Sequence, residues 1–177
     1  MAIETAIAWV SLVLASGLLI ATGASKILSP AASEPLLAVL RIPAAFRSGR
    51  ALGVIEICLG SAALITADQR LIAAEAVAFT IFAAVLAYVL AARVPLSSCG
   101  CAGARDTPPS LLHVGLNLAA AGATTFAAIE SPPTLIEMWP KLDLLGVPLV
   151  IGVATAIALW LVAMGPLAEL TIVLAHA

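Results

Sequence analysis

Five long apolar runs dominate this chain, and they constrain its fold more than any other feature. Four of them cover residues 5–25, 50–67, 71–92 and 111–129, and a fifth covers 144–164. A helix needs about 20 apolar residues to cross a bilayer, where it also satisfies its own backbone hydrogen bonds. We therefore expect an all-α integral membrane helical bundle, with four core transmembrane helices and a fifth toward the C-terminus.

The composition agrees with a membrane location and excludes other classes of protein. Hydrophobic residues make up 63% of the 177 residues and charged residues 10%, whereas soluble domains have roughly 45–50% and about 25%. The net charge is -2 and no Lys/Arg-rich run is present, so the chain lacks the basic surface that binds nucleic acid. We predict one membrane domain over 1–177, with a core bundle at 5–130, an additional C-terminal helix at 144–177, and lipid as its surroundings.

Two connections are predicted to lie on the same face of the membrane. The connection at 29–49 contains an apolar stretch at 36–40 that is too short to span a bilayer, so we expect it at the interface. Because each crossing reverses the chain direction, the loop at 94–110 returns to that face. Six of the eight basic residues are placed there and two on the opposite face; they are Lys26, Arg41, Arg47, Arg50, Arg93 and Arg105, against Arg70 and Lys141.

The loop at 94–110 carries two of the three cysteines, Cys99 and Cys101, on either side of Gly100. Its Pro, Ser and Gly residues make it polar and turn-prone, which favours a reactive role for these thiols over packing. A disulfide between cysteines with a single residue between them closes a small strained ring, and strained, exposed disulfides are oxidising and labile. Gly100 supplies the backbone freedom for that closure. The pair is therefore the candidate catalytic dithiol, in which one sulfur attacks and the other resolves.

Charged and polar groups near the cysteines complete the candidate site. Arg93, Arg105 and the N-terminus of the fourth apolar run are placed to stabilise a thiolate. His113 either exchanges protons with a thiol or forms hydrogen bonds at the helix end. Glu56 lies six residues into the second run, roughly 9 Å below the cysteine face, and a carboxylate in hydrocarbon needs a partner. We expect that partner to be Lys26, in a pair that serves either proton handling or structure alone.

Four other polar residues in or beside the apolar runs receive structural interpretations. Glu75, near the start of the third run, is expected to stay at the lipid headgroups and complement the positive helix end. Asn117 is expected to form a hydrogen bond between helices. Cys58 is expected to be packed in the bundle, as free cysteines usually are. Ser110 is the predicted N-cap of the fourth run.

Two further classes of function stay open. The first is a carrier or transporter of a soft metal such as copper, zinc or mercury, in which Cys58, Cys99 and Cys101 bind the cation in turn. Two neighbouring sulfurs without a histidine cluster make an incomplete metal shell, so redox chemistry is favoured over metal binding. The second is a non-catalytic assembly factor whose bundle holds a partner protein.

Short motifs in the first, second and third runs and in the cysteine loop occur in a characteristic order. They are Ser16-Gly17, Ala24-Ser25-Lys26, Ile55-Glu56 with Gly60, and Cys99-Gly100-Cys101-Ala102-Gly103. Over roughly residues 5–130 they resemble the MauE family of methylamine-utilisation proteins, itself related to DoxX-type membrane proteins. The family usually has an aromatic residue at the position of Ala102, and the segment after Ile129 looks like an addition to the family frame.

The resemblance implies a thiol–disulfide oxidoreductase in the inner membrane of a bacterium. Its partner would be a thioredoxin-like protein, and its client an extracytoplasmic protein that needs disulfides for maturation. Carried over to this chain, it implies Cys99 and Cys101 as the redox pair, with Lys26 and Glu56 as supporting positions. The basic residues would place the cysteine face in the cytoplasm, but we favour the outer face, as the resemblance implies. A quinone is a candidate electron acceptor by analogy alone.

Overall fold

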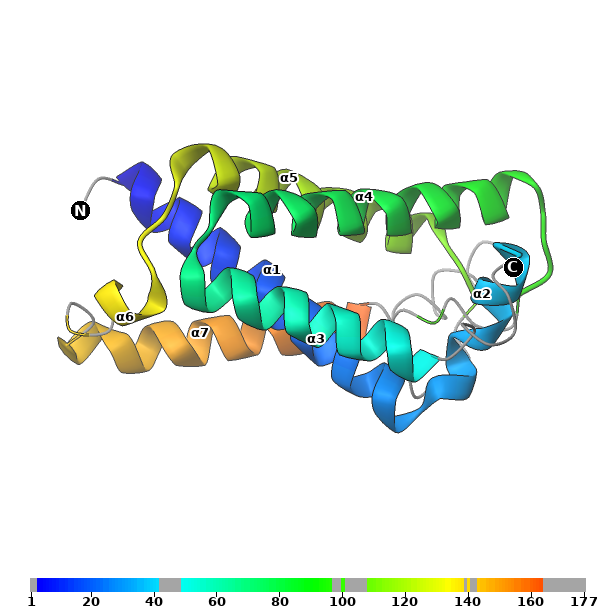
Figure 1. The fold of residues 1–177 in the computed structure, drawn as a ribbon, viewed down its shortest axis with the longest axis horizontal. Helices are drawn as coiled ribbons and strands as arrows, with labels where there is room; N and C mark the ends of the chain where they lie inside the picture. Colours follow the sequence, from blue (N-terminus) through cyan, green and yellow to red (C-terminus); the bar gives the residue numbers. More distant parts are fainter. Residues whose placement is uncertain are drawn as a thin grey trace, which may run out of the picture.

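The computed structural model describes residues 3–41, 49–96, 100, 108–138, 140 and 143–163, and within them it contains helices and no strands. Four helices are long and apolar enough to cross a membrane (Figure 1). They are α1 (Ile3–Leu28), α3 (Gly49–Thr66), α4 (Gln69–Ala91) and α5 (Leu111–Glu130). The predicted all-α bundle with four core crossings is confirmed.

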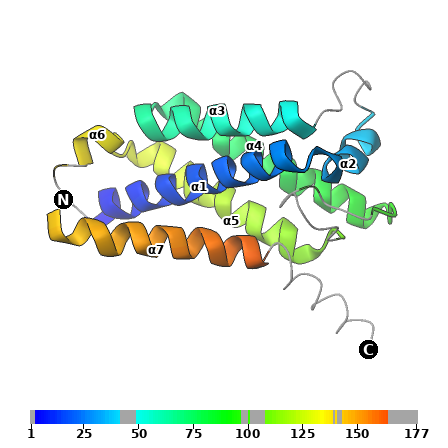
Figure 2. The ribbon, with the colours of Figure 1, turned by 90° about the horizontal axis from the view of Figure 1, so that it is seen from below.

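The remaining elements are η1 (Pro30–Ala32), α2 (Glu34–Val39), α6 (Leu135–Met138) and α7 (Asp143–Val162). With six residues, α2 is too short to cross, as predicted for this connection, and it buries Leu36 and Leu37 against the end of the bundle. The fifth apolar run forms α7, which lies along α1 (Figure 2). With 20 residues, α7 is not among the four candidate membrane spans of the described residues, so the fifth crossing stays a prediction.

The long helices alternate in direction, which determines which segments share an end of the bundle. The main contacts are α1 with α3, α4 with α5, and α1 with α5. One end carries the last turn of α1, α2, the start of α3 and the end of α4, while the turn between α3 and α4 lies at the other end (Figure 1). Gly100 packs at the first end, against the segment that follows α1. The predicted common face of the two connections is therefore confirmed.

Glycines let the backbones of α1 and α3 come into direct contact. A Cβ atom on Gly23 would lie 2.6 Å from the Gly53 carbonyl oxygen, and one on Gly53 would lie 2.5 Å from the Gly23 carbonyl oxygen. Small residues allow this close packing in membranes, where van der Waals contact replaces the hydrophobic effect as the driving force. Lys26 and Glu56 each follow one of these glycines by three residues, about one helical turn, so the crossing point brings the two side chains together.

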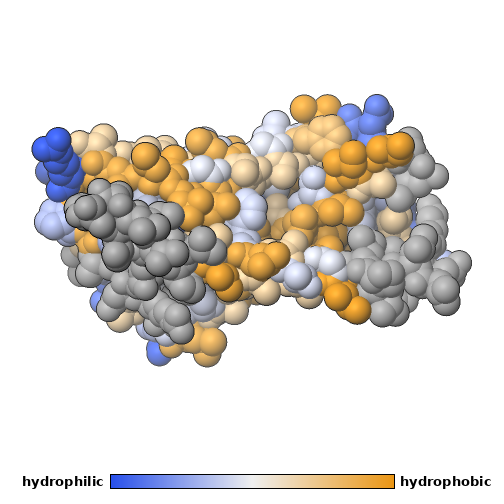
Figure 3. Space-filling view, turned by 180° about the vertical axis from the view of Figure 1, so that it is seen from behind, coloured by the Kyte–Doolittle hydropathy of each residue, from blue (hydrophilic) through white to orange (hydrophobic). Residues whose placement is uncertain are grey.

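The outer surface of the bundle is apolar. Figure 3 shows hydrophobic residues over much of one face, with hydrophilic residues gathered toward the ends. Each of the long helices contributes exposed large side chains, among them Ile7, Val54, Ile81 and Leu118. Water would not stabilise such a surface, whereas lipid does, and a helix in lipid needs no polar outer face.

Candidate functional site

A buried ion pair joins α1 and α3. The ammonium of Lys26 donates a hydrogen bond to Glu56 Oε2 at 2.8 Å, and the two side chains are 5% and 3% exposed. The hydroxyl of Thr22 donates to the same oxygen at 3.3 Å. Glu56 Oε1 is also buried and has no hydrogen-bond partner among the described residues. The predicted pairing is confirmed, and it leaves one carboxylate oxygen unsatisfied.

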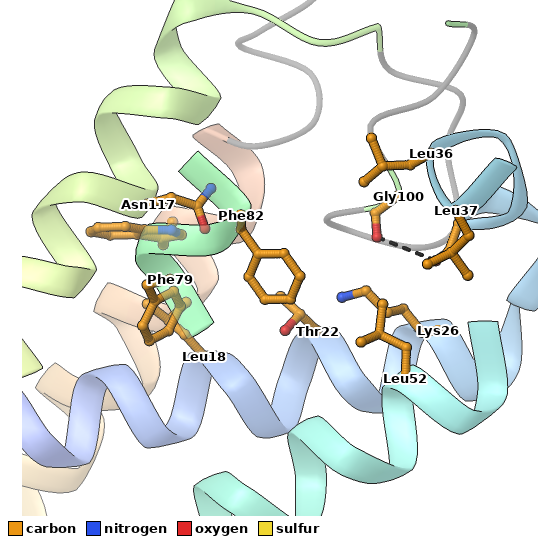
Figure 4. A pocket seen from close by; sticks show the side chains of 12 residues that line it. Leu18, Thr22, Lys26, Leu36, Leu37, Leu52, Phe79, Phe82, Gly100 and Asn117 are labelled. Carbon is orange, nitrogen blue, oxygen red and sulfur yellow. Dashed lines mark hydrogen bonds between the residues drawn. The ribbon is translucent and has the colours of Figure 1, made fainter. Parts of the chain in front are cut away.

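A cavity opens beside this pair at the end of the bundle that carries Gly100. It holds about 510 Å³ of space between side chains, including the part that opens to the outside. Figure 4 shows the nitrogen of Lys26 pointing into it, toward the ring of Phe82, whose centroid is 5.7 Å away. The other lining residues are mostly apolar; they are Leu18, Thr22, Ser33, Leu36, Leu37, Leu52, Phe79, Gly100, Asn117 and Trp160.

Gly100 occupies a position that only glycine fits. Its φ is +67°, in the left-handed region that side chains with a Cβ disfavour. A Cβ atom there would also lie 2.9 Å from Ser33 Cα and 3.2 Å from the Ala32 carbonyl oxygen. The Ser33 hydroxyl donates to the Gly100 carbonyl at 3.5 Å (the dashed line in Figure 4). The residue between the two candidate redox cysteines is thus held against the segment that follows α1.

Three of the predicted site residues, Cys99, Cys101 and Arg105, lie outside the described residues. Arg93 is exposed just after the end of α4, in a left-handed turn with φ +51°. Cys58 is exposed on α3, so the expectation that it packs inside the bundle is wrong. The reason is helical geometry, because two residues rotate the helix by about 200° and Glu56 already faces inward.

His113 forms hydrogen bonds at the start of α5. Its Nδ1 lies 2.8 Å from the Ser110 hydroxyl and accepts the Ser110 backbone N–H at 3.2 Å. This reciprocal arrangement is a capping box, which confirms Ser110 as the N-cap. The Asn117 amide donates to the His113 carbonyl at 2.8 Å. That bond lies within α5, so the expected hydrogen bond between helices is not the one that forms.

Glu75 is a buried carboxyl that the sequence interpretation misplaced at the headgroups. Its side chain is fully buried, and neither carboxyl oxygen has a hydrogen-bond partner among the described residues. The reason is rotational, since Ile72, Phe79 and Leu86 on the same helix are also buried and their spacing puts Glu75 on their face. That spacing was the signal that could have revealed it.

The sequence of the chain matches the model of a known protein family. The model of the family described as "Methylamine utilisation protein MauE" matches residues 3–130. The chain belongs to the MauE family. The matched part of this MauE protein contains α1 to α5, the Lys26–Glu56 pair and the Cys-Gly-Cys motif, while α6 and α7 follow it. No curated protein and no solved structure matches the chain. It is thus a multi-pass membrane protein of a family associated with methylamine utilisation.

Proposed function

We propose that this MauE-family protein is a membrane thiol–disulfide redox protein, in which Cys99 and Cys101 exchange electrons with a thioredoxin-like partner and support disulfide formation in an extracytoplasmic client. The observation that carries the proposal is the seating of Gly100. A buried glycine with φ +67° holds the motif beside a buried ion pair and a cavity. Glycine is the residue that adopts this conformation in a tight turn, and a bond between the cysteines on either side of it would require a tight turn.

The exchange balances as a transfer of two electrons and two protons. A thiolate of the partner attacks one sulfur of the Cys99–Cys101 disulfide, the S–S bond breaks, and a mixed disulfide forms while the other cysteine leaves as a thiolate. The partner's second thiol then attacks the mixed disulfide. The partner ends as a disulfide, and Cys99 and Cys101 end as thiols that carry the two protons. Exchange of this kind is fastest for strained, accessible disulfides.

The other residues support the thiols in this proposal. Arg93 and Arg105 lower the free energy of the leaving thiolate through their positive charge. His113 positions the start of α5, where the cysteine loop re-enters the bundle. Lys26 and Glu56 receive and return protons at the buried side of the motif, and Glu56 Oε1 has a free lone pair for this task. Their contribution is electrostatic and local, since buried charges interact strongly in a medium of low dielectric constant.

A redox titration of the purified protein tests the proposal. Alkylation of free thiols at a series of defined potentials, followed by mass measurement, is expected to show a reversible two-electron change. The change should disappear in Cys99→Ser and in Cys101→Ser. It should persist in Cys58→Ser, because Cys58 is exposed on α3 and does not belong to the cysteine loop. Thiols that stay free under every oxidant would refute the redox role. Metal that co-purifies and is lost in Cys58→Ser would instead support the soft-metal carrier.

The same titration tests the role of Gly100. Alanine in a left-handed conformation costs about 1–2 kcal/mol, and we expect the closed ring to require this conformation at its middle residue. Gly100→Ala should therefore disfavour the disulfide and raise the midpoint potential by roughly 20–40 mV. Gly115→Ala is the matched control, because nothing lies within 4 Å of a Cβ atom there.

Full maturation of the client in cells with both Cys99 and Cys101 changed to Ser would favour the assembly-factor hypothesis.

We also propose that the protein resides in a bacterial inner membrane with the cysteine face outward. Lys26 is neutralised by Glu56 inside the bundle, so it does not count among the free positive charges that retain a loop in the cytoplasm. In a Cys58→Ser background, a maleimide that cannot cross membranes is expected to label Cys99 or Cys101 in intact cells after reduction. Labelling that occurs only after the cells are permeabilised would reverse the orientation.

A further inference from the structure

A buried polar layer lies between the two apolar clusters that form the core of the bundle. The helices α1, α4 and α5 each contribute residues to both clusters. Where these helices pass from one cluster to the other they carry Ser16, Glu75 and Thr124, and each of the three is 0% exposed. Polar groups in such a place cost free energy in a membrane unless their hydrogen bonds are satisfied.

Glu75 and Ser16 hold the unsatisfied atoms of this layer. Both carboxyl oxygens of Glu75 and the hydroxyl oxygen of Ser16 are buried without a hydrogen-bond partner among the described residues. The Thr124 hydroxyl, by contrast, donates to the Ala120 carbonyl at 2.8 Å within α5. Ser16 faces Glu75 across the contact of α1 with α4, close enough to interact electrostatically with the carboxyl but without forming a hydrogen bond.

The described part of the chain places no cation beside Glu75. The buried titratable groups on the helices that pack against α4 are Lys26 on α1, Glu56 on α3 and His113 on α5. Lys26 lies ten residues from Ser16, about 15 Å along the helix, and its ammonium is bound to Glu56. His113 forms its hydrogen bonds at the start of α5. The other charged or titratable residues of these four helices are exposed; they are Glu4, Arg50, Cys58, Arg70, Tyr88 and Glu130.

One hydrogen atom would satisfy this group of oxygens. An ionised carboxylate is costly to bury without a partner, and such a group becomes neutral by taking up a proton. A protonated carboxyl has an O–H donor, which Glu75 can direct to Ser16 Oγ. A divalent metal ion fits less well, because Mg²⁺ and Ca²⁺ take about six to eight oxygen ligands, whereas three unsatisfied oxygens are grouped here.

We propose that Glu75 and Ser16 form a proton-binding site inside the membrane, in which Glu75 is a neutral carboxylic acid at neutral pH and donates a hydrogen bond to Ser16 Oγ. Binding adds one proton to the carboxylate and removes its negative charge. The bundle then holds two buried carboxyls of opposite character, since Glu56 is ionised against Lys26. Ionisable residues within membrane spans often belong to proton relays. The inference is independent of the thiol chemistry, because no cysteine belongs to the site.

Infrared spectroscopy of the purified full-length protein, in a detergent without ester groups, tests the site. A protonated carboxyl has a C=O stretching band that is separate from the bands of carboxylates and peptide groups. The band is expected at neutral pH and should disappear in Glu75→Gln. It should persist in the double variant Lys26→Met with Glu56→Leu, which removes the paired carboxyl. Identical spectra of the parent and Glu75→Gln, or loss of the band in the double variant alone, would overturn the proposal.

A matched pair of serine variants on α1 tests the hydrogen bond. Ser16→Ala removes the acceptor of the carboxyl O–H and should therefore shift the frequency of the Glu75 band. Ser25→Ala is the control, because the Ser25 hydroxyl donates to the Thr22 carbonyl at 2.7 Å within the same helix, and it should leave the band unchanged. A band that is the same in both variants would contradict the pairing of Glu75 with Ser16.

The pH dependence of stability provides a measurement that needs no spectral assignment. Above about pH 4.3, where an accessible glutamate ionises, the unfolded chain releases a proton that Glu75 retains in the folded bundle. The stability of the parent should therefore fall as the pH rises, relative to that of Glu75→Gln, which stays neutral. The ratio of their folding constants should change by up to about tenfold per pH unit. Equilibrium unfolding in mixed micelles measures this ratio, and a ratio that does not vary between about pH 5 and pH 8 would refute the proton site.

Discussion

Lys26→Met is expected to lower the free energy of unfolding by about 3–5 kcal/mol, because it leaves the carboxylate of Glu56 buried without its cation. The two groups are 2.8 Å apart and almost fully buried, and no other cation of the described residues forms an ion pair with Glu56. Thermal unfolding in detergent, followed by circular dichroism, measures the loss. Arg70→Met removes an exposed cation in the first turn of α4, at the other end of the bundle, and should change stability by less than about 0.5 kcal/mol.

The double variant Lys26→Met with Glu56→Leu should recover most of that stability. Replacing both members of a buried ion pair by apolar residues of similar size is often neutral or even stabilising. This variant separates the two roles predicted for the pair. A stable protein that has lost two-electron exchange would show that the pair serves chemistry. Full activity in the same stable protein would show that its role is structural, and a double variant no more stable than Lys26→Met would contradict the ion-pair account.

The fold was largely predictable because bilayer thickness imposes a length on every crossing. Four runs of apolar residues became four helices at the expected places, and Ser110 begins α5 as the predicted cap. The depth of Glu56 in the membrane was equally predictable, because the rise per residue of a helix gives its distance below the cysteine face. The pairing with Lys26 followed from the cost of a lone charge in hydrocarbon, and the structure confirms it.

Rotation about each helix axis was harder to predict than depth. In a soluble protein the polar face of a helix reports its orientation, but in lipid both faces are apolar and this signal is weak. Cys58 was therefore expected inside and is exposed, while Glu75 was expected at the headgroups and is fully buried. The packing of α2 and Gly100 around the cavity was also beyond prediction, because it joins segments far apart in the sequence.

The α1–α3 crossing leads to the second large effect, which we expect from Gly53→Val. Even the Cβ atom of the new side chain would lie 2.5 Å from the Gly23 carbonyl oxygen. That oxygen belongs to the backbone of α1, so it cannot rotate aside as a side-chain atom could. The helices must separate, and the free energy of unfolding should fall by about 3 kcal/mol or more.

Gly122→Val on α5 is the matched control for this prediction, because nothing lies within 4 Å of a Cβ atom at that position. It should keep the stability of the parent protein or raise it by a few tenths of a kcal/mol, since valine is a better helix former than glycine. Separation of α1 from α3 also pulls Lys26 away from Glu56, so Gly53→Val should make a subsequent Lys26→Met change cost much less than it does in the parent. Equal costs of Lys26→Met in the two backgrounds would mean that the glycine contact does not hold the ion pair together.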